Sequence, residues 1–304
     1  MRSPLAVARD VAEAIGAGRP VVALETAVVT HGLPHPDGPE AAAGMEDAVR
    51  AAGAVPALIG ILDGQVRVGV TAAELQRLAT SPGVVKVNPG NLAAVTASGR
   101  AGGTTVAATL AIAHHAGIGV LATGGIGGVH RDVVESGDVS ADLIALARFP
   151  VAVVCSGAKS VLDLPRTLEA LETFGVPVYG VGTDRLPAFH RRDSGLALDQ
   201  RFDRIDDLAA AIRAHRALGL NTGLVIANPV PERDELPREL YESALAQAQA
   251  DAAREGVRGR AVTPFLLERM RVLTGGRSVV TNRALLVDNA RVAGELAVAL
   301  SLLR

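Results

Sequence analysis

Cysteine and aromatic residues are scarce in this chain of 304 residues, and positive charge is not in excess. The single cysteine, Cys155, can form neither an internal disulfide nor a cysteine-rich zinc site. Lysine and arginine total 30 against 32 acidic residues, and the aromatic residues are five Phe and two Tyr with no Trp. Binding a nucleic acid needs basic charge for the backbone and aromatic rings for unpaired bases. The composition therefore excludes a general nucleic-acid binder.

Long hydrophobic segments are absent as well. No run of about 18 residues is free of charged and polar side chains, which argues against a membrane-spanning helix. Near the start of the chain, Arg2, Arg9 and Arg19 interrupt the apolar stretch that a signal peptide needs. We therefore expect a cytoplasmic protein with no membrane partner.

Lysine is the rarest charged residue of the chain. Only Lys86 and Lys159 are lysines, and the other 28 basic residues are arginines. An ammonium group can lose its proton and attack a carbonyl carbon, whereas a guanidinium group stays protonated. Lys86 lies in the apolar run VVKVN, and Lys159 follows the run VAVVCSGA. Both positions are therefore candidates for contact with a substrate.

Apolar runs rich in valine, isoleucine and leucine alternate with helical patterns over most of the chain. Several runs are continuous, which is typical of parallel strands covered on both faces. The pattern predicts an α/β fold, in which helices sandwich a largely parallel central sheet within a single domain, residues 1–304. The run Gln65–Val68 after Asp63-Gly64 indicates a hairpin, which leaves a mixed sheet open.

The expected elements follow from these runs and from the helix signals between them. The expected strands span 20–26, 55–62, 83–87, 118–123, 151–156, 176–182 and 223–228. The expected helices span about 38–52, 71–80, 104–116, 140–148, 160–174, 205–218 and 234–255. Two more are expected near the end of the chain, one from Thr263-Pro264 to Gly275-Gly276 and one over about 279–303.

Chemically distinctive residues fall at the carboxyl ends of the expected strands. In open α/β sheets this edge is where ligands bind. Glu25, Thr123 and Asn228 each end an apolar run, Lys86 lies in one, and Lys159 follows another. We therefore expect these residues to surround a ligand site.

Two glycine-rich segments are candidates for close contact with a ligand. Residues 124–128 read GGIGG, but they match neither a dinucleotide-binding fingerprint nor a phosphate-binding loop that ends in Lys-Ser or Lys-Thr. They favour close approach of the backbone to a ligand, with a plain tight turn as the alternative. Residues 102–106, GGTTV, open a helix and favour an anion site, with ordinary capping by Thr104 as the alternative.

Asp138, Ser140 and Asp142 place three oxygen side chains two residues apart. Hard divalent cations prefer such ligands, although an EF-hand loop is excluded because Gly and Glu are missing at its fixed positions. The alternative is that Ser140 caps a helix and Asp142 favours its positive end. His130 precedes this segment and could transfer protons, but a single histidine in a loop is more often merely exposed.

A series of phrases resembles the pseudouridine-5′-phosphate glycosidase family, also called pseudouridylate synthases. They are, in order, ALETAVVTHGLPHP, GGTTVAATL, ATGGIGGVHR, DVSADL, VAVVCSGAKSVLDLPRTLEALET, VGTDRLPAF, ANPVP and TPFLLERM, and they extend over roughly residues 5–300. The resemblance implies an indigoidine-synthase-A-like α/β/α fold. It also implies reversible cleavage of pseudouridine 5′-phosphate by water to uracil and ribose 5-phosphate, a role in pseudouridine catabolism, a Mn²⁺ or similar cofactor, and a homotrimer.

The resemblance implies roles for individual residues. It makes Glu25 the proton donor, Lys159 the Schiff-base lysine and Asp138 a metal ligand. After the lysine that matches Lys86, the family usually continues with Ser or Thr and basic residues, whereas this chain reads VNPGNLA, so phosphate contacts around 88–91 stay open. The implied substrate contacts are Lys86, Val106 and Ser140-Ala141-Asp142, with Thr123 beside them, while His130 and Asn282 match further catalytic and substrate-binding positions.

The reaction explains why such residues are needed. The bond to be broken joins ribose C1′ to a carbon of uracil, so the two-carboxylate scheme of ordinary glycosidases has no leaving oxygen to protonate. A lysine can instead hold C1′ as an imine while a carboxylic acid protonates the departing carbon. Two alternatives stay open. A Schiff-base aldolase-type lyase acting on another sugar phosphate needs no pyrimidine, and a non-catalytic sugar-phosphate or nucleotide sensor needs no nucleophilic lysine.

Overall fold

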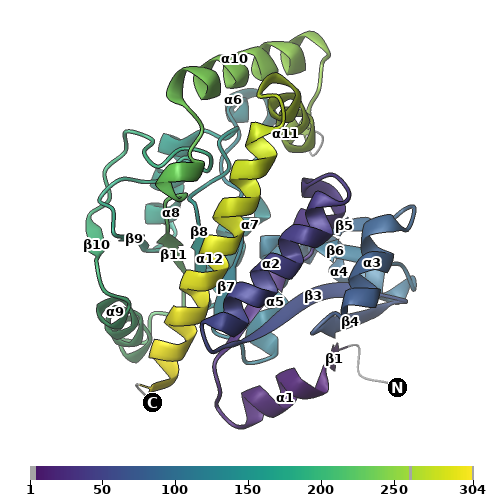
Figure 1. Cartoon of the computed structure of the whole chain (residues 1–304), viewed down its shortest axis with the longest axis vertical. Helices are drawn as coiled ribbons and strands as arrows, with labels where there is room; N and C mark the ends of the chain where they lie inside the picture. Colours follow the sequence, from purple (N-terminus) through teal and green to yellow (C-terminus); the bar gives the residue numbers. More distant parts are fainter. Residues whose placement is uncertain (1–4, 260–261, 303–304) are drawn as a thin grey trace.

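One hydrogen-bonded sheet runs through the part of the chain that the computed structural model describes, residues 5–259 and 262–302 (Figure 1). Paired strands are parallel, except that β3 pairs antiparallel with β4 and β6. The order across the sheet is β1 (Leu5–Val7), β4 (Gln65–Val68), β3 (Val55–Leu62), β2 (Val21–Glu25), β7 (Val120–Ala122), β8 (Ala152–Cys155), β11 (Leu224–Ala227), β9 (Val178–Val181) and β10 (Gln200–Phe202). β6 (Gly102–Thr104) branches from β3 and pairs with β5 (Val85–Val87).

Helices cover both faces of the sheet, with one apolar cluster under each layer. Val22 and Leu24 of β2 point into one cluster and Val21 and Ala23 into the other, as alternate residues of a strand do. The first face is covered by α2 (Asp37–Ala51), α3 (Ala72–Thr80), α9 (Ile205–Ala217) and α12 (Arg277–Leu302), and α2 and α12 lie side by side on it (Figure 1). The second face is covered by α1 (Arg9–Gly16), α5 (Val106–His115), α7 (Ala141–Arg148) and α8 (Leu164–Thr173).

The remaining helical segments lie mainly outside these two layers. They are the π-helix η1 (Val28–Gly32), α4 (Pro89–Ala97), α6 (Val133–Ser136), the 3₁₀ turn η2 (Glu232–Asp234), α10 (Arg238–Arg254) and α11 (Val262–Leu273). Within residues 5–259 and 262–302, no helix is both long enough and apolar enough to cross a membrane.

The α/β/α architecture predicted from the sequence is confirmed, and the sheet is mixed. All expected strands and helices are present with ends that differ by a few residues, and the expected end at Leu303 lies outside the described residues. The sequence did not reveal β1, β6, β10, α1 or α4. β6 was hidden because Gly102-Gly103 indicates a turn. Both glycines are needed because a Cβ atom there would collide with Val87 and Thr30 respectively.

Candidate active site

The carboxyl ends of the parallel strands open into a cavity of about 930 Å³. Residues in or just after β2, β5, β7 and β8 line it, and α5, α7 and α12 supply others from near their first turns. The predicted site residues that line this cavity are Glu25, Lys86, Val106, Thr123, His130, Asp138, Ser140, Ala141, Asp142, Lys159 and Asn282, whereas Asn228 does not line it. The sequence therefore identified the location of the cavity from strand ends that lie far apart along the chain.

Glu25 is a buried carboxylic acid at the end of β2, with 6% of its surface exposed. The hydroxyl of Thr123, which follows the neighbouring strand β7, donates a hydrogen bond to Glu25 Oε1. Burial raises the pKa of Glu25, and the positive charge of Lys159 and the Thr123 hydrogen bond only partly oppose this effect. Glu25 therefore keeps its proton to a higher pH than an exposed glutamic acid, as a general acid requires.

Lys159 lies where the loops after β7 and β8 are joined by backbone hydrogen bonds. Its N–H donates to the carbonyl of Ile126 at 3.0 Å, and the Ile126 N–H donates to the carbonyl of Gly157 at 3.1 Å. Gly157 has φ +77°, and a Cβ there would collide with the carbonyl of Pro187, so only glycine fits this turn. The turn holds the lysine backbone next to the GGIGG segment, with its side chain facing the cavity that contains Glu25.

Lys86 and Arg100 bring further positive charge to the cavity. Lys86 is exposed to the cavity, yet the surrounding protein and the charge of Lys159 both lower its pKa. Asn88 and Asn91 also line the cavity, but they form the capping box of α4, which occupies their side chains. Arg100 was not identified from the sequence, because one arginine among 28 carries no signal. Arg100 provides a cation near residues 88–91, the segment whose contacts with a phosphate the sequence left undecided.

Asp142 fixes the backbone around the cavity and is 5% exposed. Its Oδ1 accepts from the N–H of Ala107 at 2.9 Å, and its Oδ2 accepts from the N–H of Gly127 at 2.7 Å. Ser140 caps α7 by accepting from the Asp142 N–H, as the alternative interpretation of this segment expected. The capping alternative for Thr104 is wrong, because Thr105 caps α5.

The GGIGG segment passes too close to its neighbours for side chains. A Cβ at Gly127 would collide with Ser140, and one at Gly128 would collide with Thr167. The glycines of this segment therefore bring the backbone against α7 and α8, beside the cavity, which is more than a plain tight turn requires.

The donor set around Asp138 fits only a divalent ion that keeps most of its other ligands as water or substrate oxygens. His130 Nε2 lies 3.9 Å from Asp138 Oδ2, and both residues line the cavity. The described residues contain no group of three or more His, Cys, Asp or Glu side chains that could enclose a metal ion. Because both oxygens of Asp142 already accept backbone N–H groups, Asp138 is the carboxylate of this segment best placed to ligate an ion.

Asn282 of α12 lines the cavity and carries a buried polar atom without a partner in the described chain. The residue is 7% exposed, and its Oδ1 has no hydrogen-bond partner among the described residues. An unpaired buried acceptor is costly, so a ligand N–H that pairs with it gains binding energy.

His31 lies nearby on η1 and contacts Thr30 Oγ1 through Nδ1 at 2.7 Å. Burial lowers the pKa of His31, and the charge of Lys86 lowers it further.

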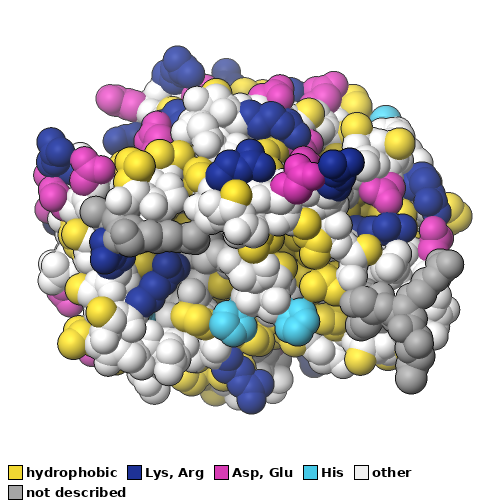
Figure 2. Space-filling model, turned by 90° about the horizontal axis from the view of Figure 1, so that it is seen from below, with side chains coloured by type: hydrophobic (Ala, Val, Ile, Leu, Met, Phe, Trp, Pro, Cys, Tyr) yellow, Lys and Arg dark blue, Asp and Glu magenta, His cyan; other side chains and the backbone are white. Residues whose placement is uncertain are grey.

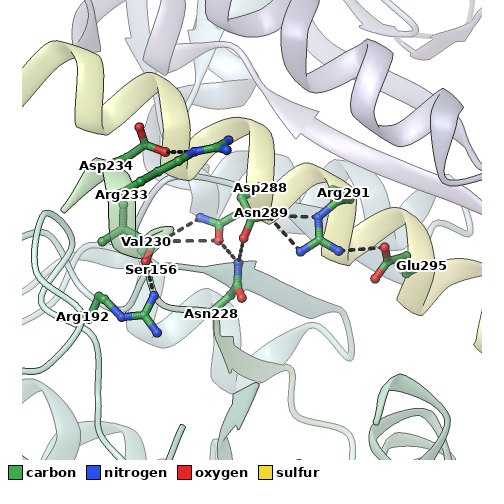
Figure 3. Close-up of polar contacts among 10 residues, drawn as sticks. All are labelled: Ser156, Arg192, Asn228, Val230, Arg233, Asp234, Asp288, Asn289, Arg291 and Glu295. Carbon is green, nitrogen blue, oxygen red and sulfur yellow. Dashed lines mark hydrogen bonds and ion pairs between the residues drawn. The ribbon is translucent and has the colours of Figure 1, made fainter. Parts of the chain in front are cut away.

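A buried polar network lies beneath the cavity (Figure 3). Asn289 of α12 donates to the carbonyl of Thr123 at 2.9 Å and to Ser156 Oγ at 3.2 Å. Asn228 donates to Asn289 Oδ1 at 3.0 Å and to Asp288 Oδ2 at 2.8 Å. Asn228 therefore supports the site from below, whereas the sequence had placed it among the ligand-facing strand ends. The role of Asn289 was missed because nothing near it in the sequence marks the contact.

The chain is similar to proteins of known family along nearly its whole length. The family described as "Indigoidine synthase A like protein" matches residues 10–299. A pseudouridine-5′-phosphate glycosidase of Methylobacterium nodulans is 54% identical over 96% of this chain and 87% of its own length. The enzyme of the same name from Myxococcus xanthus is 52% identical over 97% of this chain and 98% of its own.

Two solved structures share the fold. The prealnumycin C-glycosynthase in complex with ribulose 5-phosphate is 40% identical, with a TM-score of 0.91 over 98% of this chain and 97% of that one. An indigoidine synthase A-like protein of Thermotoga maritima is 35% identical, with a TM-score of 0.88 over 98% of this chain and 96% of that one.

Proposed function

Because the chain belongs to the indigoidine synthase A-like protein family, we propose that it reversibly cleaves the carbon–carbon glycosidic bond of pseudouridine 5′-phosphate. The products are uracil and ribose 5-phosphate. The observation that carries the proposal is the meeting of the buried acid Glu25 and the amine of Lys159 in one cavity. The curated relatives at about 50% identity are named for this activity, and a structural neighbour is a C-glycosynthase.

Binding of the phosphate falls to the cations of the cavity. Lys86 and Arg100 both line it, and Arg100 has no ion-pair partner among the described residues. The asparagines that stand where the family usually has basic residues are engaged in the α4 capping box. We therefore assign the phosphate to Lys86 and Arg100, which hold the substrate through charge and guanidinium hydrogen bonds.

Lys159 carries the covalent step. Its Nζ attacks C1′ and displaces the ring oxygen, which takes up the proton that the nitrogen loses, so that the sugar opens with a neutral nitrogen bound at C1′. Protonation of the uracil carbon by Glu25 then lets the C1′–carbon bond break. The electron pair of that bond returns to the uracil ring while the nitrogen lone pair forms the imine. Water hydrolyses the imine, which releases ribose 5-phosphate and restores the lysine.

Recognition of the base rests on Asn282. Its unpaired Oδ1 is a hydrogen-bond acceptor, and uracil presents N–H donors at the ring edge. A substrate without such a donor leaves this buried oxygen unpaired and loses the corresponding binding energy. Once the Asn282 side chain turns this oxygen toward the cavity, it favours a pyrimidine substrate over the aldolase alternative.

Asp138 and the neighbouring His130 are the residues that would hold a Mn²⁺ or similar ion. Such an ion supplies positive charge next to substrate oxygens when it is bound. A homotrimer, a cytoplasmic location and a role in pseudouridine catabolism complete the proposal, and they rest on the family resemblance alone.

The test is release of uracil from pseudouridine 5′-phosphate, followed by chromatography together with borohydride trapping of the imine. We expect uracil in amounts equal to ribose 5-phosphate, and substrate-dependent labelling of Lys159. An aldolase would give no uracil, and a sensor would give neither uracil nor a trapped adduct. Either result would overturn the proposal.

A further inference from the structure

A second cavity, of about 220 Å³, lies at the opposite end of the sheet from the active site. It is formed where β2 and β7 begin, between α9 and the end of α12. Three arginines line it, Arg19 just before β2 and Arg213 and Arg216 on α9. None of the described residues that line it is an aspartate or a glutamate. This arginine pocket therefore gathers positive charge that its own walls do not neutralise.

Arg216 is held in place within the arginine pocket. Its Nη2 donates to the carbonyl of Gly119 at 3.0 Å, immediately before β7 begins. A Cβ at Gly119 would lie 3.0 Å from the same nitrogen, so the guanidinium fits here because residue 119 is glycine. Burial lowers the pKa of Arg216. The local backbone thus orients this guanidinium without supplying a counter-charge.

Several other arginines of the described chain form ion pairs with carboxylates. Arg191 lies 2.9 Å from Glu235, and Arg269 forms an ion pair with Asp251. Within residues 5–259 and 262–302, Arg19, Arg213 and Arg216 form no ion pair, although these side chains share one small cavity. These side chains are exposed, and neighbouring like charges repel one another even where water screens them. An anion bound in the pocket would offset this repulsion.

We propose that the arginine pocket binds a small phosphorylated anion, either inorganic phosphate or a phosphate monoester. Guanidinium groups present donors in a planar fork that matches phosphate oxygens, and three of them can engage several oxygens of one group. The volume accommodates a phosphate with a few attached carbon atoms. Figure 2 views the molecule from below relative to Figure 1 and shows dark blue basic side chains scattered over this face among acidic and apolar ones.

Binding there would join four elements of the fold. Arg19 and Gly119 mark the starts of β2 and β7, whose other ends carry Glu25 and Thr123. An anion held between Arg19 and the α9 arginines would tie both strand starts to α9 and α12. Because it binds only the folded protein, it should raise the midpoint of thermal unfolding as its concentration rises.

The test counts bound phosphates by equilibrium dialysis with labelled inorganic phosphate at constant ionic strength. We expect the double variant Arg19→Gln/Arg213→Gln to bind one phosphate per chain fewer than the wild type, with unchanged kcat and KM. Both arginines are exposed, so the variant should fold normally. Arg148→Gln removes an exposed arginine that lines neither cavity and should bind as the wild type does. An unchanged count in the double variant, or an equal loss in Arg148→Gln, would refute the pocket.

A second variant isolates the arginine pocket from the active site. Lys86→Gln/Arg100→Gln removes the proposed phosphate cations of the catalytic cavity, and it should still bind one phosphate. Displacement of that phosphate by ribose 5-phosphate would identify a sugar monoester as the ligand, whereas no displacement would identify free phosphate. No bound phosphate in this variant would overturn the proposal. Since the comparison depends on a difference in count, it holds whether or not the proposed reaction is correct.

Discussion

The side-chain amide of Asn289 donates a 2.9 Å hydrogen bond to the backbone carbonyl of Thr123, whose hydroxyl in turn donates to Glu25. The helix α12 therefore fixes the end of β7, where Thr123 holds the proposed acid Glu25 of β2. Asn289 is fully buried and also contacts Ser156 and Asn228, so its amide orientation is set by several partners. The acid is positioned by backbone and network contacts in addition to its own strand.

Asn289→Leu should reduce kcat while leaving KM for pseudouridine 5′-phosphate nearly unchanged. It leaves the Thr123 carbonyl unpaired and removes one of the two acceptors of the Asn228 amide, which should also lower the free energy of unfolding by about 1–3 kcal/mol. Ser156→Ala is the matched control, because it keeps the bond from Asn289 to Thr123. Steady-state kinetics on fully folded protein decide the point: unchanged kcat per folded molecule would make Asn289 a purely structural residue.

Thr123→Val should move the alkaline limb of the pH–rate profile to higher pH. The Thr123 hydroxyl donates to Glu25 and thereby lowers the pKa that burial raises. Without this donor the pKa of Glu25 rises further, so the protonated acid persists to higher pH. Thr123→Ser keeps a hydroxyl and serves as the control. A limb that stays in place, or moves to lower pH, would contradict the assignment of Glu25 as the acid.

Glu25→Gln should lower uracil release by about 10²–10⁴-fold, the usual contribution of general acid catalysis, while substrate still binds. The stability of the wild type should depend on pH in the opposite direction from that given by a carboxylate whose pKa is lowered by folding. Because burial raises the pKa of Glu25, the wild type loses stability as pH rises through that value, whereas the variant has no such titration. Thermal midpoints measured across pH test this. A variant that is destabilised but active would exclude the catalytic role.

Replacing each lysine by arginine should distinguish the roles of Lys86 and Lys159. Lys86→Arg keeps the cation at the phosphate and should raise KM with partial loss of kcat, whereas Lys159→Arg removes the only proposed imine former and should abolish turnover. Borohydride trapping followed by mass spectrometry provides the readout. The assignment is reversed if Lys86→Arg loses the trapped adduct and Lys159→Arg keeps it.

Removing a divalent ion should stop the reaction reversibly. With Asp138 as the main protein ligand, Mn²⁺ is expected to bind weakly and to exchange readily, so a chelator should abolish activity and added Mn²⁺ should restore it. Electron paramagnetic resonance of Mn²⁺ should show weaker binding in Asp138→Asn, independently of turnover. Full activity of metal-stripped protein in excess chelator would refute the cofactor.

The features that could be predicted from the sequence are those encoded in local patterns, such as apolar strands and the polar residues at their ends. Glu25 and Lys159 stand beside continuous apolar runs, and parallel strands bring their carboxyl ends to one edge, so their meeting followed from the strand assignment. Asn289 gave no such signal, because its partners Thr123 and Asn228 lie on other elements far away in the chain. Asp142 was identified, but its bonds to Ala107 and Gly127 require knowledge of how α5 meets the glycine segment.

The placement of α12 also affects how the protein is made. α12 is the last described helix to leave the ribosome, yet it packs on α2, β2, β7 and β8 and supplies Asn282 and Asn289. Until it is synthesised, the apolar face of those strands lacks its cover, and contacts across such long sequence separations form slowly. We expect a nascent chain that ends before α12 to be inactive and dependent on chaperones. Catalysis should therefore begin only after α12 has docked.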